Sequence, residues 1–374
     1  MLRKKLNVAL AAGVLGTSLV ALATTGAGAA ATNCAKATSA TACGGMKSLI
    51  AAAKKEGTLN VIALPANWAN YGQLISSFSK KYGIKVNSAT PDGSSQDEIN
   101  ALVQGKGRTL APDVIDVGTS YATSNLRLLA PYKVATWNEI PAALKSPSGR
   151  WFDDYGGYVA IGCNTKIVSV CPTSFQQLLS PVYKNEVGIN GDPTQFGSAF
   201  SALYAATLAN GGSFNNIQPG IDFFAQLNKV GNYVPGGSAA TAASGATPIL
   251  IWWDYLQNSI QSTVSTWKIN IPTDASYAAY YTQAISSSAP HPAAARLWEE
   301  YLYSVVGQNL WLKGYARPVE LAVMSAKGTA NKRYLAQLPA APKGTVAYPT
   351  LAQLTAAKAV VASNWAAAIS GANG

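Results

Sequence analysis

The sequence has few of the residues that most metal and nucleophilic sites need. It contains one histidine, His291, and four cysteines among 374 residues. With a single imidazole and no cysteine spacing typical of zinc, metal chemistry through histidine is nearly excluded. A Ser-His-Asp hydrolase would have to use His291, and no G-x-S-x-G motif is present. A glycosidase that uses two carboxylates remains open, because Asp153, Asp154, Asp192 and Asp254 are available.

Acidic residues are scarce as well. The chain has 17 Asp and Glu against 28 Lys and Arg, which gives a formal net charge of +11. The basic residues are scattered and form nothing longer than pairs such as Lys54-Lys55 or Lys80-Lys81. A nucleic-acid-binding protein concentrates such residues on one face, so we expect no nucleic-acid partner. The charge indicates a weak attraction to an anionic cell envelope instead.

Only the beginning of the chain carries a long apolar run. Basic residues at 3–5 precede an apolar stretch over 6–23, and small residues with A-x-A sites follow. This pattern predicts a cleaved signal peptide over 1–29. A lipidated Cys34 is the alternative, although Asn33 before it makes a poor lipobox. No later stretch is long and apolar enough to span a bilayer. We therefore expect an extracytoplasmic protein, secreted, periplasmic or attached to the cell surface.

The mature chain of about 345 residues suits two domains. Four cysteines in an exported chain suggest two disulfides. Cys34 and Cys43 lie in a small and polar stretch over 30–45 that reads as a linker, and Cys163 and Cys171 lie in the middle of the chain. Pairing within each local pair is the simplest of three possible connectivities.

Strands and helices alternate in two series along the chain. In the first series we expect strands at 58–64, 84–89 and 114–117 and helices at 46–55, 68–81 and 97–104. In the second series we expect strands at 159–163, 186–189 and 248–251 and helices at 174–179, 193–210 and 220–230. This alternation indicates an α/β fold of two lobes, each a mostly parallel sheet flanked by helices.

The first lobe lacks a return strand unless the extended residues around 277–285 supply it. We therefore expect the chain to cross between the lobes at about 155–160 and again at about 272–280. The predicted division is lobe 1 over 46–157, lobe 2 over 158–274, a return to lobe 1 over 275–318, and a C-terminal helical segment over 319–374 that packs mainly on lobe 2.

The stretch Pro248–Tyr255 is the strongest candidate for a binding site. A short buried strand is followed at once by Trp252, Trp253, Asp254 and Tyr255. In open α/β sheets ligands bind beyond the carboxyl ends of strands, so these residues are typical of a small-molecule pocket with one charged anchor. The alternatives are that one tryptophan belongs to the core and that Asp254 caps a helix.

The remaining candidates follow other strands or begin helices that face the same crevice. Together the predicted ligand-binding residues are Asn67, Trp68, Ser94, Ser95, Ser120, Tyr121, Tyr155, Asp192, Thr194, Gln195, Trp252, Asp254 and Tyr255. Asn67 and Asp192 can also be read as helix caps. Ser94 and Ser95 can be ordinary turn residues. His291 precedes Pro292 and reads as the start of a helix.

Several segments together resemble the extracytoplasmic solute-binding proteins of ABC importers, in the branch that holds ferric-iron, polyamine and phosphonate binders. The segments that carry the resemblance are 56–62, Leu129–Pro131 (LAP), Ala142–Trp151 (AALKSPSGRW), Gly191–Gln195 (GDPTQ), 247–255, Ala289–Leu297 (APHPAAARL) and Gly307-Gln308. Their order spans nearly all of the mature chain.

The resemblance implies a periplasmic-binding-protein-like fold, with two lobes that are joined by crossing strands and close around a ligand. It also implies a membrane permease as partner, driven by a cytoplasmic ATPase. This chain has no GxxxxGK[ST] loop, so the ATPase is another protein. We expect a monomer without catalytic activity or cofactor.

An organic cation such as putrescine or spermidine is the expected ligand. Aromatic faces attract cations, and Asp254 would pair with an amine. Iron(III) fits less well, because iron-binding relatives have two adjacent tyrosines where this chain has Asp254-Tyr255. A phosphonate, held by the helix start at Thr194, and a sugar, stacked on tryptophan, remain alternatives.

Overall fold

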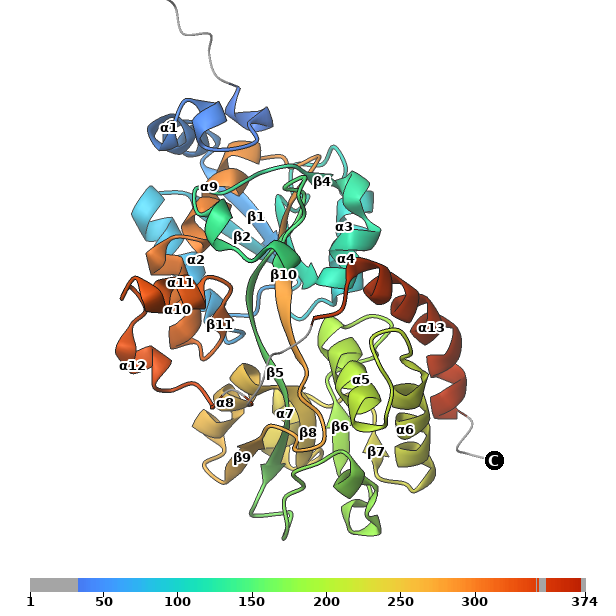
Figure 1. The fold of residues 1–374 in the computed structure, drawn as a ribbon. Helices are drawn as coiled ribbons and strands as arrows, with labels where there is room; N and C mark the ends of the chain where they lie inside the picture. The colour runs from blue at the N-terminus through green and yellow to red at the C-terminus, as the bar shows by residue number, and fades with distance from the viewer. Residues whose placement is uncertain (1–32, 341, 343–347, 371–374) are drawn as a thin grey trace, which may run out of the picture. The chain divides into compact units, whose positions relative to one another are not determined.

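The computed structural model describes residues 33–340, 342 and 348–370 of the chain (Figure 1). The predicted signal peptide over 1–29 lies outside the described residues. The described residues from Asn33 onward form one compact unit. Within the described ranges, no helix combines the length and the apolar character that crossing a membrane requires.

The elements form two lobes that share strand β5 (Phe152–Asn164). Lobe 1 contains α1 (Met46–Glu56), β1 (Thr58–Ile62), α2 (Tyr71–Tyr82), β2 (Lys85–Ala89), α3 (Ser95–Gln104), β3 (Val114–Gly118), α4 (Thr119–Ser124), β4 (Leu129–Ala130), β10 (Ala278–Ser286), α9 (Pro292–Leu302), α10 (Val305–Lys313), β11 (Arg317–Pro318), α11 (Leu321–Ala326) and α12 (Lys332–Leu335). Lobe 2 contains β6 (Val187–Ile189), α5 (Gly197–Ala209), α6 (Gln218–Lys229), β7 (Tyr233–Val234), α7 (Ala239–Ser244), β8 (Ile249–Trp253), α8 (Asp254–Thr263) and β9 (Trp267–Asn270). Helix α13 (Leu351–Ser370) contacts both lobes.

Local sequence signals explain where several of these elements begin and end. Helices α1 and α2 end at Gly57 and Gly83, which adopt the left-handed conformation that glycine tolerates best. Helix α3 begins with a capping box, in which Ser94 and Asp97 each bind the other's backbone N–H. Strand β8 consists of five buried apolar residues and continues through Trp252 and Trp253, two residues beyond the predicted strand at 248–251.

Strands β5 and β10 form the hinge between the lobes. The first half of β5 pairs with β10 and β11, and from Val159 onward β5 pairs with β8 and β9. Figure 1 shows the two long strands running together from one lobe to the other. This arrangement confirms the predicted crossing-strand hinge. The lobe boundaries at 157/158 and 274/275 stay a prediction, and the nearest change in pairing lies between Tyr158 and Val159.

The sheets are mixed, which corrects the expectation of mostly parallel sheets. Strand β1 pairs in parallel with β2, and β6 pairs in parallel with β7 and β8. However, β10 is antiparallel to β3 and β5, and β5 is antiparallel to β8. Hydrogen bonding therefore continues through β5, in the order β3-β10-β5-β8-β6-β7. An alternation of strands and helices predicts the relative direction of neighbouring strands only within one lobe. Strand β10 enters lobe 1 from lobe 2 and is therefore antiparallel to β3.

The expected linker over 30–45 is folded from Asn33 onward, so this prediction is wrong for the described residues. Short 3-10 helices at Cys34–Lys36 and Thr41–Cys43 pack against α1 and α9. Arg296 Nε donates to the Ala37 carbonyl at 2.6 Å. The predicted disulfides Cys34–Cys43 and Cys163–Cys171 are both present. The first of them closes a tight loop, whose small residues allow close packing.

The C-terminal segment does not pack mainly on lobe 2 as predicted. Helices α11 and α12 belong to an apolar cluster with Leu312 of α10, in lobe 1. Helix α13 packs on α6 of lobe 2 and on α4 of lobe 1. Its buried side chains Leu354, Ala357, Val361 and Trp365 lie three or four residues apart, which places them on one face. The Ala-rich composition marks a helix but does not indicate what it packs against.

Candidate ligand-binding cleft

Loops that follow strands line a cleft between the two lobes. The lining residues are Ala63, Pro65, Asn67, Trp68, Pro91, Asp92, Gly93, Ser95, Glu98, Asp116 and Tyr281 from lobe 1 and Asn190, Gly191, Phe196, Gly197, Ser198, Gly236–Ala240 and Trp252 from lobe 2. Because β1 and β2 are parallel, and β6, β7 and β8 are parallel, the loops in each lobe meet at one edge. The volume of about 680 Å³ is in the range of small-molecule sites.

Asp116 is a buried carboxylate in the lining of this cleft. It interrupts the apolar strand β3 and is only 6% exposed. Its Oδ2 accepts hydrogen bonds from the Tyr71 hydroxyl at 2.6 Å and the Tyr155 hydroxyl at 2.9 Å. Its Oδ1 has no hydrogen-bond partner among the described residues. Burial raises the pKa of Asp116 to about 7, although the two tyrosines oppose this rise.

A second carboxylate, Glu98, lies directly beside Asp116. Glu98 projects from α3, is 1% exposed, and its Oε2 accepts the backbone N–H of Asp116 at 2.9 Å. Burial raises the pKa of Glu98 well above its ordinary value, and the charge of Asp116 raises it further. Two adjacent buried carboxyl groups do not readily both ionise without a cation. The pair therefore favours a positively charged ligand.

Aromatic side chains surround this acidic pair and are themselves held by hydrogen bonds. Trp68 Nε1 donates to the Tyr155 hydroxyl at 2.7 Å, and this hydroxyl donates to Asp116. The ring of Trp68 makes edge contacts with Trp252 at 5.7 Å and with Tyr281 at 5.6 Å between centroids. Trp68 comes from lobe 1 and Trp252 from lobe 2, so the two lobes meet in an aromatic edge contact that forms part of the cleft lining. Exposed aromatic faces attract cations through the ring quadrupole.

The two lobes touch at one side of the cleft. A Cβ atom on Gly118 of β3 would lie 3.2 Å from the Cα of Gly197 at the start of α5. Close by, the Tyr121 hydroxyl donates to the Thr194 carbonyl at 2.8 Å. These contacts join the end of β3 and the start of α4 in lobe 1 to the loop before α5 in lobe 2. They depend on the absence of side chains at both glycines.

Comparison with known families identifies the chain. The model of a family described as bacterial extracellular solute-binding protein matches residues 121–339, more than half of the chain. The chain belongs to the bacterial extracellular solute-binding proteins. This family acts outside the cytoplasm, and its function is solute binding.

Solved structures confirm the predicted fold of this solute-binding protein. AfuA from Actinobacillus pleuropneumoniae, with fructose-6-phosphate bound, is 18% identical with a TM-score of 0.68, covering 84% of this chain and 99% of that one. The ferric binding protein from Campylobacter jejuni is 18% identical with a TM-score of 0.59, covering 83% and 99%. A putative spermidine/putrescine ABC transporter protein from Listeria monocytogenes is 14% identical with a TM-score of 0.58, covering 82% and 99%. At these identities the likeness shows the two-lobed fold alone.

Four of the predicted site residues line the cleft of this solute-binding protein, namely Asn67, Trp68, Ser95 and Trp252. The alternative role of Asn67 as a helix cap is not observed, because α2 begins at Tyr71 with Asn70 before it. Ser95 Oγ also accepts the backbone N–H of Gly118 at 3.2 Å. These residues follow β1, β2 and the apolar core of β8, where sequence reasoning placed a ligand.

Asp254 has a different role from the one predicted. It is fully buried, its Oδ2 pairs with Arg317 Nη1 at 2.5 Å, and its Oδ1 accepts the backbone N–H groups of Tyr158 and Tyr255. It is not part of the cleft lining. Burial raises its pKa, although Arg317 opposes the rise. It is not a helix cap either, since the cap of α8 is Trp253. The internal partner of Asp254 is Arg317, which lies 63 residues further along the chain. The sequence around Asp254 does not reveal this partner, so the carboxylate looked available for a ligand.

Other predicted residues lie next to the cleft but are not part of its lining. Ser94 caps α3, Tyr155 is buried against Asp116, and Tyr255 is buried beside Asp254. Ser120 lines a separate cavity, and Tyr121 binds the carbonyl of Thr194.

The GDPTQ segment forms a turn instead of the predicted helix start. Asp192 Oδ1 accepts the backbone N–H of Thr194 at 2.7 Å and its hydroxyl at 2.6 Å, and Gln195 Nε2 donates to the same hydroxyl at 3.1 Å. Helix α5 begins only at Gly197. A side chain that binds the N–H two residues on forms an Asx-turn, which mimics a helix cap in sequence. None of these three residues lines the cleft.

The sequence carried signals for the residues that were missed. Asp116 is a charge inside the apolar run Val114–Val117, and Glu98 adjoins the buried residues Ile99 and Leu102 in α3. A carboxylate among buried positions needs a partner or a function. Each signal was visible alone, but their proximity depends on how α3 packs against β3.

Proposed function

We propose that this protein is the substrate-binding component of an ABC importer and captures a small organic cation, such as putrescine or spermidine, by closure of the hinge. The observation that carries this proposal is the acidic pair Asp116 and Glu98 in the cleft. The Asp116 Oδ1 atom, which has no partner among the described residues, is a ready acceptor for an ammonium group. A cation that both lobes contact lowers the free energy of the closed state more than that of the open state.

The aromatic walls support the same class of ligand. Trp68 and Trp252 present rings to the alkyl chain and the charge of an amine, which adds roughly 0.5–2 kcal/mol for each good contact. An amine also suits a pair of carboxyl groups whose pKa values are both raised, because it supplies the missing positive charge.

The cleft gives less support to an anionic ligand. No lysine, arginine or histidine is among its described lining residues, so a phosphonate or sugar phosphate would face carboxylates without a cationic partner. Iron(III) is also less favoured, since Tyr255 is not among the described lining residues of the cleft. A sugar stacked on Trp68 or Trp252 is the second candidate, because stacking alone does not require charge.

The groups that a hydrolase would use lie elsewhere. His291 precedes α9, and its Nδ1 contacts Asp113 Oδ2 at 2.9 Å. Neither His291 nor any of Asp153, Asp154, Asp192 and Asp254 is part of the cleft lining. This placement favours capture and delivery over catalysis. We further propose that the protein acts as a monomer that delivers its ligand to a membrane permease, with a separate ATPase.

Isothermal titration of the mature chain tests the proposal. Putrescine and spermidine should bind, whereas fructose 6-phosphate, methylphosphonate and ferric citrate should not. Glu98→Gln should weaken putrescine binding by about tenfold to a hundredfold, since it removes a hydrogen-bonded charge. Asp192→Asn, an exposed carboxylate outside the cleft, is the matched control and should bind like the wild type. Binding of the anions or iron without the amines would contradict the proposal.

A further inference from the structure

A second cavity lies on the other side of the contact between Gly118 and Gly197, and we call it the hinge cavity. Its volume is about 360 Å³, which is enough for a small molecule. The first turns of α4 and α13, the segment 143–153, helix α5 and strand β10 enclose it. Gly197 and Tyr281 line both this cavity and the cleft, so they mark the border between the two.

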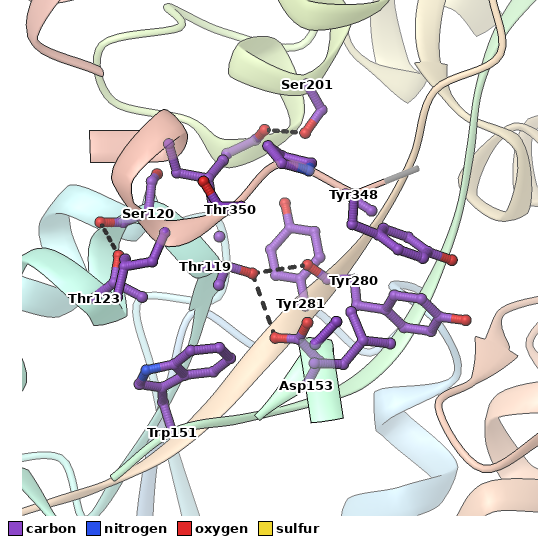
Figure 2. A pocket seen from close by; sticks show the side chains of 18 of the residues that line it. Thr119, Ser120, Thr123, Trp151, Asp153, Ser201, Tyr280, Tyr281, Tyr348 and Thr350 are labelled. Carbon is purple, nitrogen blue, oxygen red and sulfur yellow. Dashed lines mark hydrogen bonds between the residues drawn. The ribbon is translucent and has the colours of Figure 1, made fainter. Parts of the chain in front are cut away.

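One carboxylate lies in the wall of the hinge cavity. Figure 2 shows Asp153 next to Thr119, between Trp151 and Tyr280. Asp153 Oδ1 accepts the hydroxyl groups of Thr282 at 2.5 Å and Thr119 at 3.3 Å. Within the described residues no hydrogen bond involves its Oδ2, which leaves that oxygen for a ligand. Asp153 is the single acidic residue among the described lining residues.

The rest of the wall is largely apolar and aromatic. Lobe 1 contributes Trp151 and Tyr280, lobe 2 contributes Phe200, the segment just before β10 contributes Tyr277, and Leu354 of α13 closes one side. A ligand that covers such apolar and aromatic surface removes it from water, which is favourable. The wall therefore suits a ligand with an apolar body.

Among the described lining residues the one basic side chain, Lys145, is directed elsewhere. Lys145 Nζ donates to the Trp137 carbonyl at 2.5 Å and lies 5.0 Å from the centre of the Trp137 ring. It is thus bound to neighbours in its own segment, and no described salt bridge joins it to Asp153. No described basic residue therefore pairs with Asp153.

We propose that the hinge cavity is a second binding site, distinct from the cleft, for a monocation with an apolar body. Its ammonium group pairs with Asp153 Oδ2, and its aromatic or aliphatic body lies against Trp151, Phe200 and Tyr277. A diamine fits poorly here, because its second charge would lose water against apolar walls without a second carboxylate. The chemical class is therefore an arylalkylamine or a similar amphipathic amine.

Titration of the mature chain with 2-phenylethylamine tests this site, with 2-phenylethanol as the uncharged probe of the same shape. We expect one molecule of the amine to bind, and the alcohol to bind at least about tenfold more weakly. Asp153→Asn should weaken amine binding by a similar factor. Ala143→Trp places a ring at the exposed rim of the cavity and should block the amine while leaving the cleft intact.

Glu98→Gln is the control that separates this site from the cleft, because Glu98 lines the cleft alone. Phenylethylamine should bind this variant as it binds the wild type, whether or not the cleft takes putrescine. Three results would overturn the proposal. They are no binding of phenylethylamine by the wild type, binding unchanged in both Asp153→Asn and Ala143→Trp, and loss of binding in Glu98→Gln.

Discussion

Asp116 has two tyrosine donors on one oxygen and no described partner on the other. Burial dominates over these donors and raises the pKa of Asp116 to about 7. Folding of the empty protein therefore takes up a proton between the ordinary carboxyl range and about pH 7, so this group lowers stability as pH rises through that window. A bound cation lowers the pKa of Asp116, because it favours the ionised carboxylate over the protonated one.

Putrescine binding should consequently depend on pH. Below about pH 7 the amine has to displace a proton from Asp116, so its affinity should rise by up to about tenfold per pH unit from pH 5 to 7 and then level off. Titrations in buffers of different ionisation enthalpy should show net proton release from the protein on amine binding below pH 7. Asp116→Asn should give a weaker affinity with a shallower dependence on pH, because only Glu98 of the acidic pair then titrates. A wild-type affinity that is constant over this range would contradict the assignment.

Asp254 should matter for stability and not for binding. Removing one partner of a buried ion pair leaves the other charge unpaired, which costs about 3–5 kcal/mol. Asp254→Asn should therefore lower the free energy of unfolding in urea by this order and leave putrescine affinity unchanged. Arg317→Met should destabilise similarly, and the double variant by less than the sum. A stable Asp254→Asn protein that no longer binds the amine would restore the direct ligand role.

At the level of elements, the alternation of apolar and polar segments predicts whether a segment forms a helix or a strand. It predicts less well which other elements that segment packs against. Asn67, Trp68, Ser95 and Trp252 were found because the ends of parallel strands meet at one edge. The acidic pair was missed because its side chains come from α3 and the interior of β3, whose packing no local pattern reveals. Arg317 was missed for the same reason, since β11 reaches β5 only through the tertiary fold.

Helix α13 is rich in alanine, and its sequence does not reveal which elements it packs against, yet it has a defined position in the structure. Trp365 packs at 5.6 Å from the ring of Phe224 in lobe 2, while Lys358 Nζ lies 3.3 Å from the ring centre of Tyr121 in lobe 1. Burial lowers the pKa of Lys358 to about 8. The helix therefore depends on a few anchors along one buried face.

Loss of the largest anchor should release α13 before the rest of the protein. Replacing a buried tryptophan by alanine costs about 3–5 kcal/mol, which should exceed the local stability of one docked helix. In Trp365→Ala, hydrogen exchange should become faster in α13 while β5 stays protected. Val360→Ala, on the exposed face of the same helix, should exchange like the wild type. Equal acceleration in both elements would show that α13 unfolds only with the whole protein.

For the whole molecule, the contact between Gly118 and Gly197 limits how closely the lobes approach. A side chain at either position would meet the backbone of the other lobe at 3.1–3.2 Å, which is tighter than ordinary packing. The contact exists only when the lobes are together, so crowding there penalises the closed state selectively.

Gly118→Ala should therefore weaken ligand binding, although Gly118 itself is not among the described lining residues of the cleft. Overpacking costs about 1–3 kcal/mol, which corresponds to a loss of roughly fivefold to a hundredfold in putrescine affinity. Small-angle scattering with saturating putrescine should show a larger radius of gyration than the wild type. An unchanged affinity in Gly118→Ala would show that binding does not require this approach of the lobes.

The pairing of β10 between β3 and β5 also sets the order in which the protein can fold. Lobe 1 begins with the first described residues, yet the strand that fills the middle of its sheet is Ala278–Ser286, which follows all of lobe 2 in the chain. During synthesis, β3 therefore lacks its partner β10 until most of the chain has been made. Pairings between such distant segments form slowly. This delay keeps the chain of this extracellular solute-binding protein unfolded for longer than a lobe built from consecutive segments would be.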